Sequence, residues 1–534
     1  MLVLAALACA QPAYPQDAAP RWRVVVVDTF NTRLSTPDEV GTAISRAAAM
    51  HANTLFVQVR RRGDAFYTDA SEPAPEDVAL AGGFDPLAEL IAQGRAAGLD
   101  VHALLTLGPV WHQASVPVDP RHVYARHGLG GTRVADGSGN WLTRTRVADG
   151  SGTSHDGYRF GRDFWLDFGH PAAVDYVVDV VTRLVERYPV DGIHLDALYY
   201  PAAPLDNASI GYNDVAVARF QRRTGRAGIP DADDRRWSDW RREQVTAVTR
   251  RIAVAAQAVR PSLVVTAAAV GDGHAPGDPA GTRAQAQRFQ NWFAWMTDGS
   301  VDAVVPQIYR QEHESPSAAE FAGWAAWMRD SPRDRPLIAG LGAYLNSAEG
   351  LVRQARAIVD ATGERGGMAL FSLAAINAPV IDNPLSVPTG RDTPQRPVED
   401  MASILRTGRT TGGQLVDPES PPLFAVQVPR PALPWKETVG HLLGVVQDDT
   451  GAPYDGVGVR LESGTRPAGP DDVVSDGSGV FAVPSVPPGA YRLRMLTPDG
   501  TGYTSECTID VAARVVTRVT VQLDGARQPI ALCR

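Results

Sequence analysis

The segment Arg187–Pro201, RYPVDGIHLDALYYP, is the most informative part of the sequence for the fold. It predicts an otherwise apolar β-strand that carries polar side chains near its end. Apolar residues alternate here with His194 and Asp196, and side chains along a β-strand point alternately to its two faces. One face therefore carries isoleucine and leucine against a helix layer, and the other carries an imidazole and a carboxyl group. A buried carboxyl group without a role is costly, so Asp196 is a candidate functional residue. His194 either contacts a substrate or positions Asp196.

Seven further β-like runs accompany this segment, and helical patterns separate nearly all of them. The eight predicted strands are Trp22–Phe30, Asn53–Arg60, Leu99–Leu107, Val190–Leu198, Ser262–Val270, Val301–Tyr309, Arg335–Tyr344 and Gly366–Ala374. Amphipathic helices are predicted at Pro37–His51, Asp85–Ala97, Pro171–Tyr188, Trp237–Val259 and Ala348–Thr362. Because parallel strands need a crossover connection, eight alternating units favour a closed (β/α)₈ barrel. A doubly wound open sheet is the alternative.

Composition divides the rest of the chain into a linker and a second domain. Residues 21–383 are assigned to the barrel, and residues 384–436, rich in Pro, Gly, Thr and Asp, are predicted to be a flexible linker. Residues 437–525 alternate apolar and polar positions around turn residues, which predicts a small β-sandwich, and residues 526–534 form a tail. The predicted fold class is α/β, a (β/α)₈ TIM barrel followed by a small all-β sandwich.

Charge and motif content exclude several kinds of protein. The net charge of −9 and the pI near 5.7 argue against nucleic acid as a partner, because phosphate binding needs a concentrated basic face. The histidines are scattered, and neither a Cys/His ligand spacing nor an HExxH helix is present, so no metal and no cofactor are predicted. After the first residues, no segment approaches the ~20 apolar residues of a membrane span.

The first 20 residues resemble an export segment. A short apolar run ends at the small residues Ala8, Cys9 and Ala10 and precedes a Pro-containing spacer. Cleavage after Ala10 would give a secreted or periplasmic protein, lipidation of Cys9 would give an outer-membrane lipoprotein, and a cytosolic protein is the third alternative. The other cysteines, Cys507 and Cys533, form either one disulfide or two free thiols.

In a (β/α)₈ barrel the active site lies at the C-terminal ends of the strands, where the βα loops converge. The strand assignment therefore selects the polar and aromatic residues at or just after strand ends as candidates. These residues are Asp28, Gln58, Arg60, Asp64, His102 (within its strand), Trp111, His112, His194, Asp196, Asp272, Gln307, Tyr309, Glu312, Glu314 and Tyr344.

Several segments together resemble a known family of bacterial proteins. The segments VQVRRRGDAFY, GLDVHALL, WLDFGHPAAVDYVVDVVTRLVERYPVDGIHLDALYYP, DWRREQVTAVTRRI and VPQIYR resemble the glycosyl-hydrolase-like family 10 proteins, in the correct order over Arg21–Ala378. The resemblance implies a (β/α)₈ glycoside hydrolase, often an exported lipoprotein, with peptidoglycan glycan strands or exopolysaccharides as substrates. The motif PPGAYRL, Pro487–Leu493, resembles the carboxypeptidase-regulatory-like (transthyretin-like) modules, which are usually accessory.

The chain departs from the family pattern at three places in the predicted cleft. Ala197 replaces a second aspartate that usually follows the position of Asp196, and Arg310 replaces a tryptophan. The third strand continues as ALLTLGPVW, Ala103–Trp111, rather than as a Trp/Asn-containing segment. These departures bear on substrate choice and on activity.

Glycoside hydrolysis needs a protonated carboxyl group and a second carboxylate. We expect Asp196 to be the general acid, because desolvation in the barrel raises the pKa of a carboxyl group. Glu312 is the predicted partner, and Asp28, Asp64, Asp272 and Glu314 remain open as alternatives. A polysaccharide-binding barrel without catalysis and a structural envelope protein are the rival functions. The predicted substrate-binding residues are Gln58, Arg60, Asp64, His102, Trp111, His194, Gln307, Tyr309 and Tyr344.

Overall fold

The computed structural model describes residues 19–80, 82–133, 139–147, 155–203, 208–277, 281–331, 334–375, 398–416, 421–463, 466–467, 473–505 and 507–523. Among these residues no helix is both long enough and apolar enough to span a lipid bilayer. The export segment predicted at residues 1–20 and the tail predicted at residues 526–534 lie outside the described residues, apart from the last two residues of the first segment.

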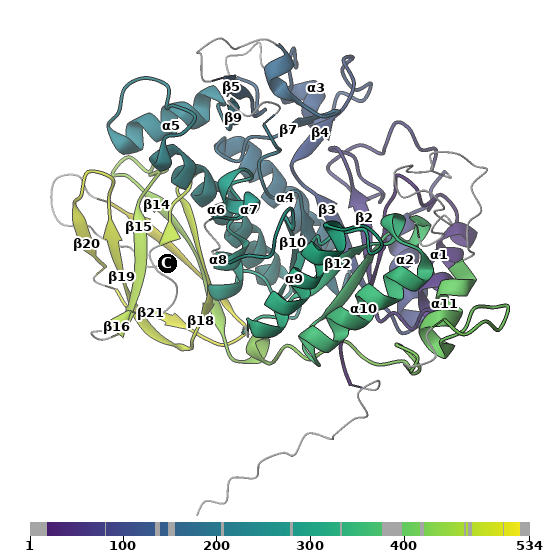
Figure 1. Cartoon of the computed structure of the whole chain (residues 1–534). Helices are drawn as coiled ribbons and strands as arrows, with labels where there is room; N and C mark the ends of the chain where they lie inside the picture. The colour runs from purple at the N-terminus through teal and green to yellow at the C-terminus, as the bar shows by residue number, and fades with distance from the viewer. Residues whose placement is uncertain are drawn as a thin grey trace, which may run out of the picture.

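Eight parallel strands form a ring in chain order, which confirms the predicted barrel (Figure 1). Hydrogen bonds join them in the order β11-β10-β8-β3-β2-β1-β13-β12. Parallel bridges from Val304 to Leu337 and from Gln307 to Gly340 connect β11 to β12 and close the ring, so the open-sheet alternative does not apply. The strands are β1 Trp22–Val27, β2 Thr54–Arg60, β3 Asp100–Thr106, β8 Gly192–Asp196, β10 Val264–Ala269, β11 Ala303–Pro306, β12 Ile338–Gly342 and β13 Gly367–Phe371.

Helices cover the outside of the ring, and local signals in the sequence set where they begin (Figure 1). Thr36, Asp85 and Ser347 each accept a hydrogen bond from a backbone N–H of the first helical turn, which satisfies a donor that has no partner within the helix. All five predicted helices are present. The helices around the barrel are α1 Pro37–Ala49, α2 Pro86–Ala96, α4 Pro171–Arg187, α6 Arg235–Val259, α8 Trp292–Thr297, α9 Ser317–Asp330 and α10 Ala348–Thr362.

Aromatic and aliphatic side chains fill the barrel interior below the strand ends. Phe56 stacks on His194 at 4.2 Å between ring centroids and on His102 at 5.3 Å. A Cβ atom at Gly192 would lie 2.5 Å from the His102 ring, so glycine is needed there. Burial lowers the pKa of His102 well below its usual value. His102, predicted to bind substrate, is instead a neutral and fully buried part of the core.

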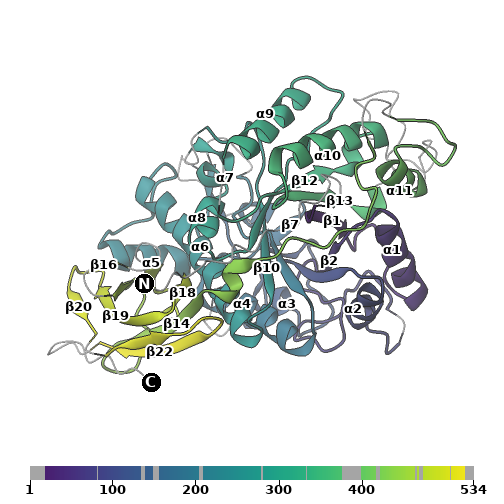
Figure 2. The same cartoon turned by 90° about the horizontal axis from the view of Figure 1, so that it is seen from below.

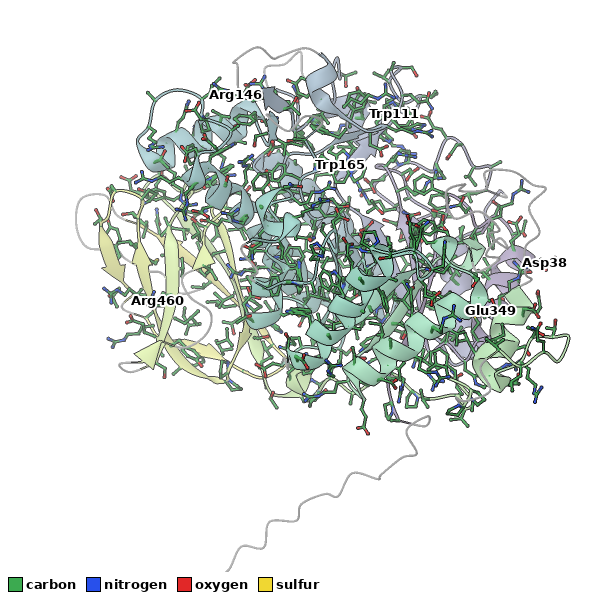
Figure 3. The ribbon with its side chains drawn as sticks, in the orientation of Figure 1. Asp38, Trp111, Arg146, Trp165, Glu349 and Arg460 are labelled. Atoms are coloured by element: carbon green, nitrogen blue, oxygen red, sulfur yellow. The ribbon has the colours of Figure 1, made fainter. Side chains whose placement is uncertain are left out.

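An insertion after β3 rises above the C-terminal ends of the strands (Figure 1). It contains β4 Pro109–Trp111, α3 Val123–His127, β5 Thr145–Val147, β6 Arg159–Phe160 and β7 Asp163–Trp165. Strands β4, β7 and β6 form a small antiparallel sheet, and Figure 3 places Trp111 and Trp165 in this upper region. Strand β5 pairs with β9, Ala208–Ile210, so the insertion is tied to the segment that follows β8.

The described part of the predicted linker is packed against the barrel, in contrast to the flexible linker that we predicted. After α11, Val398–Thr407, the chain runs below the barrel toward the second domain (Figure 2). Arg23 donates to the carbonyl of Val426 at 2.6 Å, and Lys436 forms an ion pair with Asp302 at 2.9 Å. Leu433 joins the interior core. The polar groups at the starts of the strands need partners, and this segment supplies them, which Pro and Gly content alone does not reveal.

Residues 440–522 form the predicted β-sandwich around their own apolar core. One sheet has the order β18-β14-β22 and the other has the order β16-β15-β19-β20. Cys507 takes part in a disulfide, and Cys533, its predicted partner, lies outside the described residues. The strands are β14 Gly440–Gln447, β15 Gly458–Ser463, β16 Arg466–Pro467, β17 Val473–Val474, β18 Val480–Val486, β19 Gly489–Leu496, β20 Gly502–Thr504, β21 Ile509–Val511 and β22 Val516–Gln522.

Ion pairs join the sandwich to the barrel. Arg219 of α5, Asp214–Thr224, is buried and binds both carboxylate oxygens of Asp455 at 2.7 Å. Arg251 of α6 pairs with Asp476 of the sandwich at 2.9 Å. A Cβ atom at Gly477 would lie 2.3 Å from the ring of Pro171, so the two surfaces are in close contact. The sandwich is therefore docked on the barrel.

Asp455→Asn should destabilise the chain by about 1–3 kcal/mol, because it leaves the buried charge of Arg219 without a carboxylate. Urea unfolding followed by circular dichroism measures the change. Glu462→Gln is the matched control, because Glu462 pairs with the exposed Arg494 at 3.6 Å, and such a surface pair contributes about 0–1 kcal/mol. Equal losses in the two variants would contradict a stabilising role for the domain contact.

Candidate active site

A cavity of about 280 Å³ opens at the C-terminal ends of the strands, where the fold predicts the active site. All eight strands and several loops contribute to its walls. Six of the predicted site residues line this cavity: Asp28, Gln58, His194, Asp196, Gln307 and Tyr309.

Asp196 lines this cavity at the end of β8. The hydroxyl of Thr106 donates to its Oδ2 at 3.3 Å, and the backbone N–H of Ala197 also donates to its carboxyl group. Burial raises the pKa of Asp196, and these donors oppose the shift. Tyr199 and Tyr309 face the same carboxyl group, which together with burial raises the pKa of both phenols. Asp196 forms no ion pair with another described residue, and its raised pKa favours the protonated form.

His194 lies one layer below Asp196 as a neutral ring. The hydroxyl of Thr266 donates to the carbonyl of Ile193 at 3.2 Å, so it must accept from Nδ1 of His194, 2.9 Å away. Nδ1 therefore carries the hydrogen and Nε2 does not. Burial lowers the pKa of His194 to about 3. His194 lines the cavity without adding positive charge.

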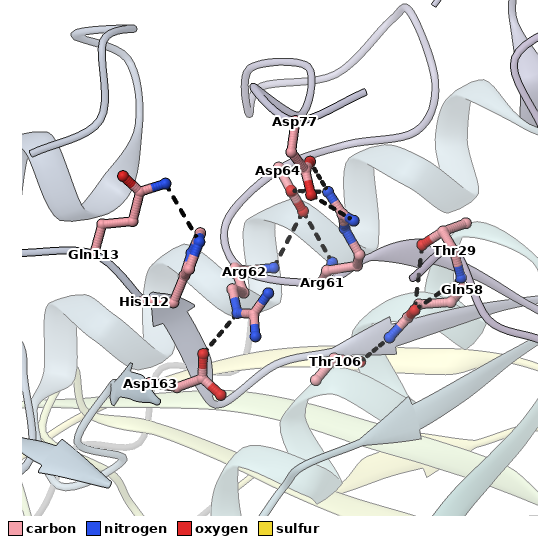
Figure 4. Close-up of polar contacts among 10 residues, drawn as sticks. All are labelled: Thr29, Gln58, Arg61, Arg62, Asp64, Asp77, Thr106, His112, Gln113 and Asp163. Carbon is pink, nitrogen blue, oxygen red and sulfur yellow. Dashed lines mark hydrogen bonds and ion pairs between the residues drawn. The ribbon is translucent and has the colours of Figure 1, made fainter. Parts of the chain in front are cut away.

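A chain of hydrogen bonds crosses four neighbouring strand ends and leads to Asp196. The backbone N–H of Thr29 donates to Oε1 of Gln58 at 3.1 Å, which turns Nε2 of Gln58 toward the hydroxyl of Thr106, also at 3.1 Å (Figure 4). Among the described residues, the hydroxyl hydrogen of Thr106 then has Oδ2 of Asp196 as its acceptor. The chain makes Oδ2 an acceptor, so a proton on Asp196 resides on Oδ1. Gln58, predicted to bind substrate, orients Asp196 through Thr106.

Asp28 also lines the cavity. Like Asp196, it forms no ion pair with another described residue. It accepts from the backbone and side chain of Asn31, at 3.0 and 2.7 Å, and from the hydroxyl of Ser372. Asp163 also lines the cavity, but its carboxylate pairs with Arg62 at 2.6 Å (Figure 4). Asp28 follows β1, and only β2 and β3 separate β1 from β8 in the ring.

Aromatic rings also line the wall. Tyr309 and Phe371 lie 5.6 Å apart between ring centroids, and both line the cavity. Phe30 at the mouth is half exposed, with the guanidinium groups of Arg61 and Arg62 within 5 Å of its ring centre. The cavity thus offers hydroxyl, amide and carboxyl groups together with aromatic rings, as a sugar with polar edges and an apolar face requires.

Glu312, the predicted partner of Asp196, is not in the cavity. Its backbone N–H donates to Asn346 at 2.7 Å, and its carboxylate binds Arg353 of α10 at 2.7 and 2.8 Å. The hydrogen bonds from Arg353 lower its pKa. The loop after β11 thus turns Glu312 toward the helix layer, and the assignment of Glu312 as catalytic partner does not fit this geometry. Glu314 does not line the cavity either.

Other predicted site residues support the cavity from outside. Arg60 is fully buried because β2 has a register shift between Gln58 and Arg60, which changes the face to which it points. It binds Glu72 at 2.9 Å and donates to the carbonyl of Thr106. Asp64 accepts from two backbone N–H groups at 3.1 Å and braces the turn after β2 (Figure 4).

The remaining predicted residues lie at the rim or in the insertion. Trp111 donates to the carbonyl of Ser115 at 2.6 Å within the insertion. Asp272 pairs with Arg288 at 3.4 Å outside the cavity. Tyr344 is 39 % exposed and lies beside Tyr309, 6.1 Å between ring centroids, just beyond the cavity. No group of three or more metal-ligating side chains occurs among the described residues.

Sequence reasoning missed several residues that line the cavity or bond to its carboxyl groups. Thr106 and Phe371 end their strands and point inward, so a strict count of alternating positions would have selected them. Asp163 comes from the insertion, and no sequence signal relates it to the barrel. Tyr199 follows Asp196 by three residues and Ser372 follows Phe371 directly, but neither has a distinguishing pattern.

Comparison with known proteins supports both resemblances found in the sequence. A family model described as Glycosyl hydrolase-like 10 matches residues 23–348, and one described as Carboxypeptidase regulatory-like domain matches residues 441–524.

Two curated relatives and a solved structure illustrate the similarity. Glycosyl hydrolase YngK of Bacillus subtilis is 24% identical over 275 residues, 49% of this chain and 46% of YngK. Glycosyl hydrolase DigH of Escherichia coli K12 is 24% identical over 279 residues, 48% of this chain and 54% of DigH. The chain thus spans about half the length of these relatives. The PgaB (BpsB) glycoside hydrolase domain of Bordetella bronchiseptica aligns with a TM-score of 0.48 at 16% identity, over 67% of this chain and 95% of that domain.

Proposed function

The chain belongs to the glycosyl hydrolase-like 10 family, and from that premise we propose that it is a glycoside hydrolase of a bacterial cell-wall or extracellular polysaccharide. The observation that carries the proposal is the pair of carboxyl groups in the cavity that lack an ion pair, Asp28 and Asp196. Hydrolysis of a glycosidic bond needs two such groups, one protonated and one ionised.

Asp196 acts as the general acid in this proposal. Its burial favours the protonated form, and Thr106 occupies Oδ2, so Oδ1 presents the proton to the glycosidic oxygen. Proton transfer to that oxygen turns the leaving sugar into an alcohol, which departs more readily than an alkoxide.

Asp28 acts as the second carboxylate. Asn31 and Ser372 donate to it, so its oxygens are held as acceptors and can receive a proton from water or stabilise the positive charge that develops on the sugar ring. This role replaces the one that we expected for Glu312.

The substrate is proposed from the shape of the wall and from the family. Tyr309, Phe371 and Tyr344 present rings to the apolar face of a sugar, while Gln307 offers an amide to its hydroxyl groups. Peptidoglycan glycan strands are the leading candidate. A substrate of this kind requires export, which is proposed from the N-terminal segment together with the alternative of a lipid anchor at Cys9.

Purified protein should release soluble fragments from denuded peptidoglycan or from one member of a panel of bacterial polysaccharides. The variant Asp28→Asn/Asp196→Asn should release none, because it lacks both the acid and the second carboxylate. Product analysis by mass spectrometry measures the release. Glu312→Gln is the matched control and should retain wild-type activity, because Glu312 lies outside the cavity.

If the double variant released as many soluble fragments as the wild-type protein, the proposed roles of the two carboxyl groups would be contradicted. Binding of a glycan by the wild-type protein, with no cleavage of any member of the panel, would instead identify the barrel as a non-catalytic carbohydrate-binding protein. Ala197, in place of the aspartate that usually follows Asp196 in the family, is the feature that favours this second function.

A further inference from the structure

A second concave site lies at the opposite end of the barrel from the proposed active site. A cleft of about 890 Å³ separates the starts of the barrel strands from the sandwich, and its walls come from both domains and from the segment that joins them. Its volume is in the range of small-molecule sites, which often lie at domain interfaces. The residues that bear on its chemistry are Arg335, Arg365, Asp334, Trp435, Thr438 and Ser485.

Arg335 is a buried charge without an anionic partner. It is 7% exposed, and no carboxylate among the described residues lies within ion-pair distance. Its guanidinium group lies 4.1 Å from the ring centre of Trp435, and one of its nitrogens donates to the hydroxyl of Ser485 at 3.1 Å. A guanidinium group has five N–H donors, so most of them have no acceptor in the described protein.

These unused donors reach the cleft. None of the nitrogen atoms of Arg335 is both buried and without a partner, so those that make no hydrogen bond are accessible, and Arg335 lines the cleft. The guanidinium group lies over the ring of Trp435, and its N–H donors are directed within its own plane. Planar donors of this kind match the two oxygens of a carboxylate.

The neighbouring acidic groups do not supply the missing anion. Asp302 is paired with Lys436 at 2.9 Å, and Asp298 is paired with Arg250 at 2.7 Å. Burial lowers the pKa of Arg335, although the charges of Asp302, Asp334 and Asp298 oppose this shift. Arg365 adds a second cation to the wall, and the exposed Asp334 forms no ion pair with another described residue. Arg335 therefore lies in a shielded position without an ion-pair partner among the described residues, which favours binding of an anion.

We propose that this cleft binds the carboxylate of an acidic saccharide, with Arg335 as the anchor and Arg365 as the second contact. Asp334 and Thr438 line the same cleft and can hydrogen-bond hydroxyl groups of the sugar ring. The site is separate from the cavity that holds Asp196, and it does not depend on the activity of that cavity. Because the cleft is formed by both domains, a bound ligand would contact the barrel and the sandwich together.

Isothermal titration calorimetry of the full chain with sodium glucuronate tests the proposal. Glucose serves as the neutral probe and inorganic sulfate as the anion without a sugar ring. We expect glucuronate to bind and glucose not to bind. Arg335→Gln should weaken glucuronate binding by about tenfold or more, since it removes a charge-assisted bidentate contact. Arg365→Gln should weaken it several-fold, and added NaCl should weaken it in the wild-type protein.

Arg353→Gln, on α10 outside the cleft, is the matched control and should bind like the wild type. Because Arg335 also contacts Ser485 of the sandwich, the melting temperature of each variant is measured as well. Arg365 is exposed, so its variant tests the site even if Arg335→Gln loosens the domain contact. Absence of glucuronate binding, or binding unchanged in both cleft variants, would overturn the proposal. Sulfate binding as tight as glucuronate binding would overturn the saccharide assignment.

Discussion

Asp196→Asn is expected to lower kcat/KM on a polysaccharide by about 10²–10⁴-fold, the usual contribution of a general acid. The amide is nearly isosteric and can still accept from Thr106, but it has no acidic proton to transfer to the glycosidic oxygen. KM should change little, because the walls of the cavity are retained. Initial rates of reducing-end formation on the substrate found in the panel measure the loss.

A comparison of substrates with different leaving groups can distinguish loss of the acid in Asp196→Asn from a general loss of structure. An aryl glycoside whose phenol departs without protonation should lose much less activity in Asp196→Asn than a natural polysaccharide does. Similar losses on both substrates would contradict the assignment of Asp196 as the acid.

The pH dependence of activity should also reflect the role of Asp196 as the acid. Since burial raises the pKa of Asp196, the protonated form persists to a higher pH than for an ordinary aspartate, and activity should fall as pH rises through that raised pKa. The same group stabilises the fold below the pKa of an unfolded aspartate and loses this contribution as pH rises through the folded value. Thr106→Val removes a donor that lowers the pKa of Asp196, so the alkaline limb should move to higher pH, and Thr106→Ser should restore it.

Glu72→Gln is expected to reduce the free energy of unfolding by about 3–5 kcal/mol, the usual cost of removing one partner of a buried ion pair. Arg60 and Glu72 are both almost completely buried, and two nitrogens of Arg60 bind the carboxylate at 2.9 to 3.0 Å. Tyr176 also donates to this carboxylate. Glutamine keeps the shape but leaves the guanidinium charge uncompensated. Urea unfolding measures the change.

Asp69→Asn is the matched control for Glu72→Gln. Asp69 pairs with Arg187, and both side chains are more than half exposed, so its loss should cost no more than about 1 kcal/mol. The double variant Arg60→Met/Glu72→Leu should recover most of the stability, because it removes both buried charges. If Glu72→Gln and Asp69→Asn cost the same, the buried pair does not stabilise the barrel in the way inferred here.

The strand pattern predicted most of the fold because it depends on short-range periodicity. Each run of alternating or continuous apolar residues identified a strand of the ring, and the amphipathic pattern located the helices between them. The same periodicity placed His194 and Asp196 on the inner face of β8, where the structure has them. Composition, in contrast, wrongly predicted a flexible linker. Leu433 and Lys436 of this segment pack against the barrel, because they have partners that are distant in the sequence.

By itself, the sequence determined the barrel, the sandwich and the direction of Asp196, since the side-chain period of a strand is a local property. Only the tertiary structure decided which carboxyl groups line the cavity together with Asp196. Glu312 and Asp28 both follow strand ends, yet an arginine of α10 holds the first away from the cavity, and Asn31 and Ser372 hold the second within it. The structure also decided that Arg60 faces outward, through a single register shift in β2. The physical reason is that a charged side chain turns toward the partner that the folded chain brings near it, and that partner can lie anywhere in the sequence.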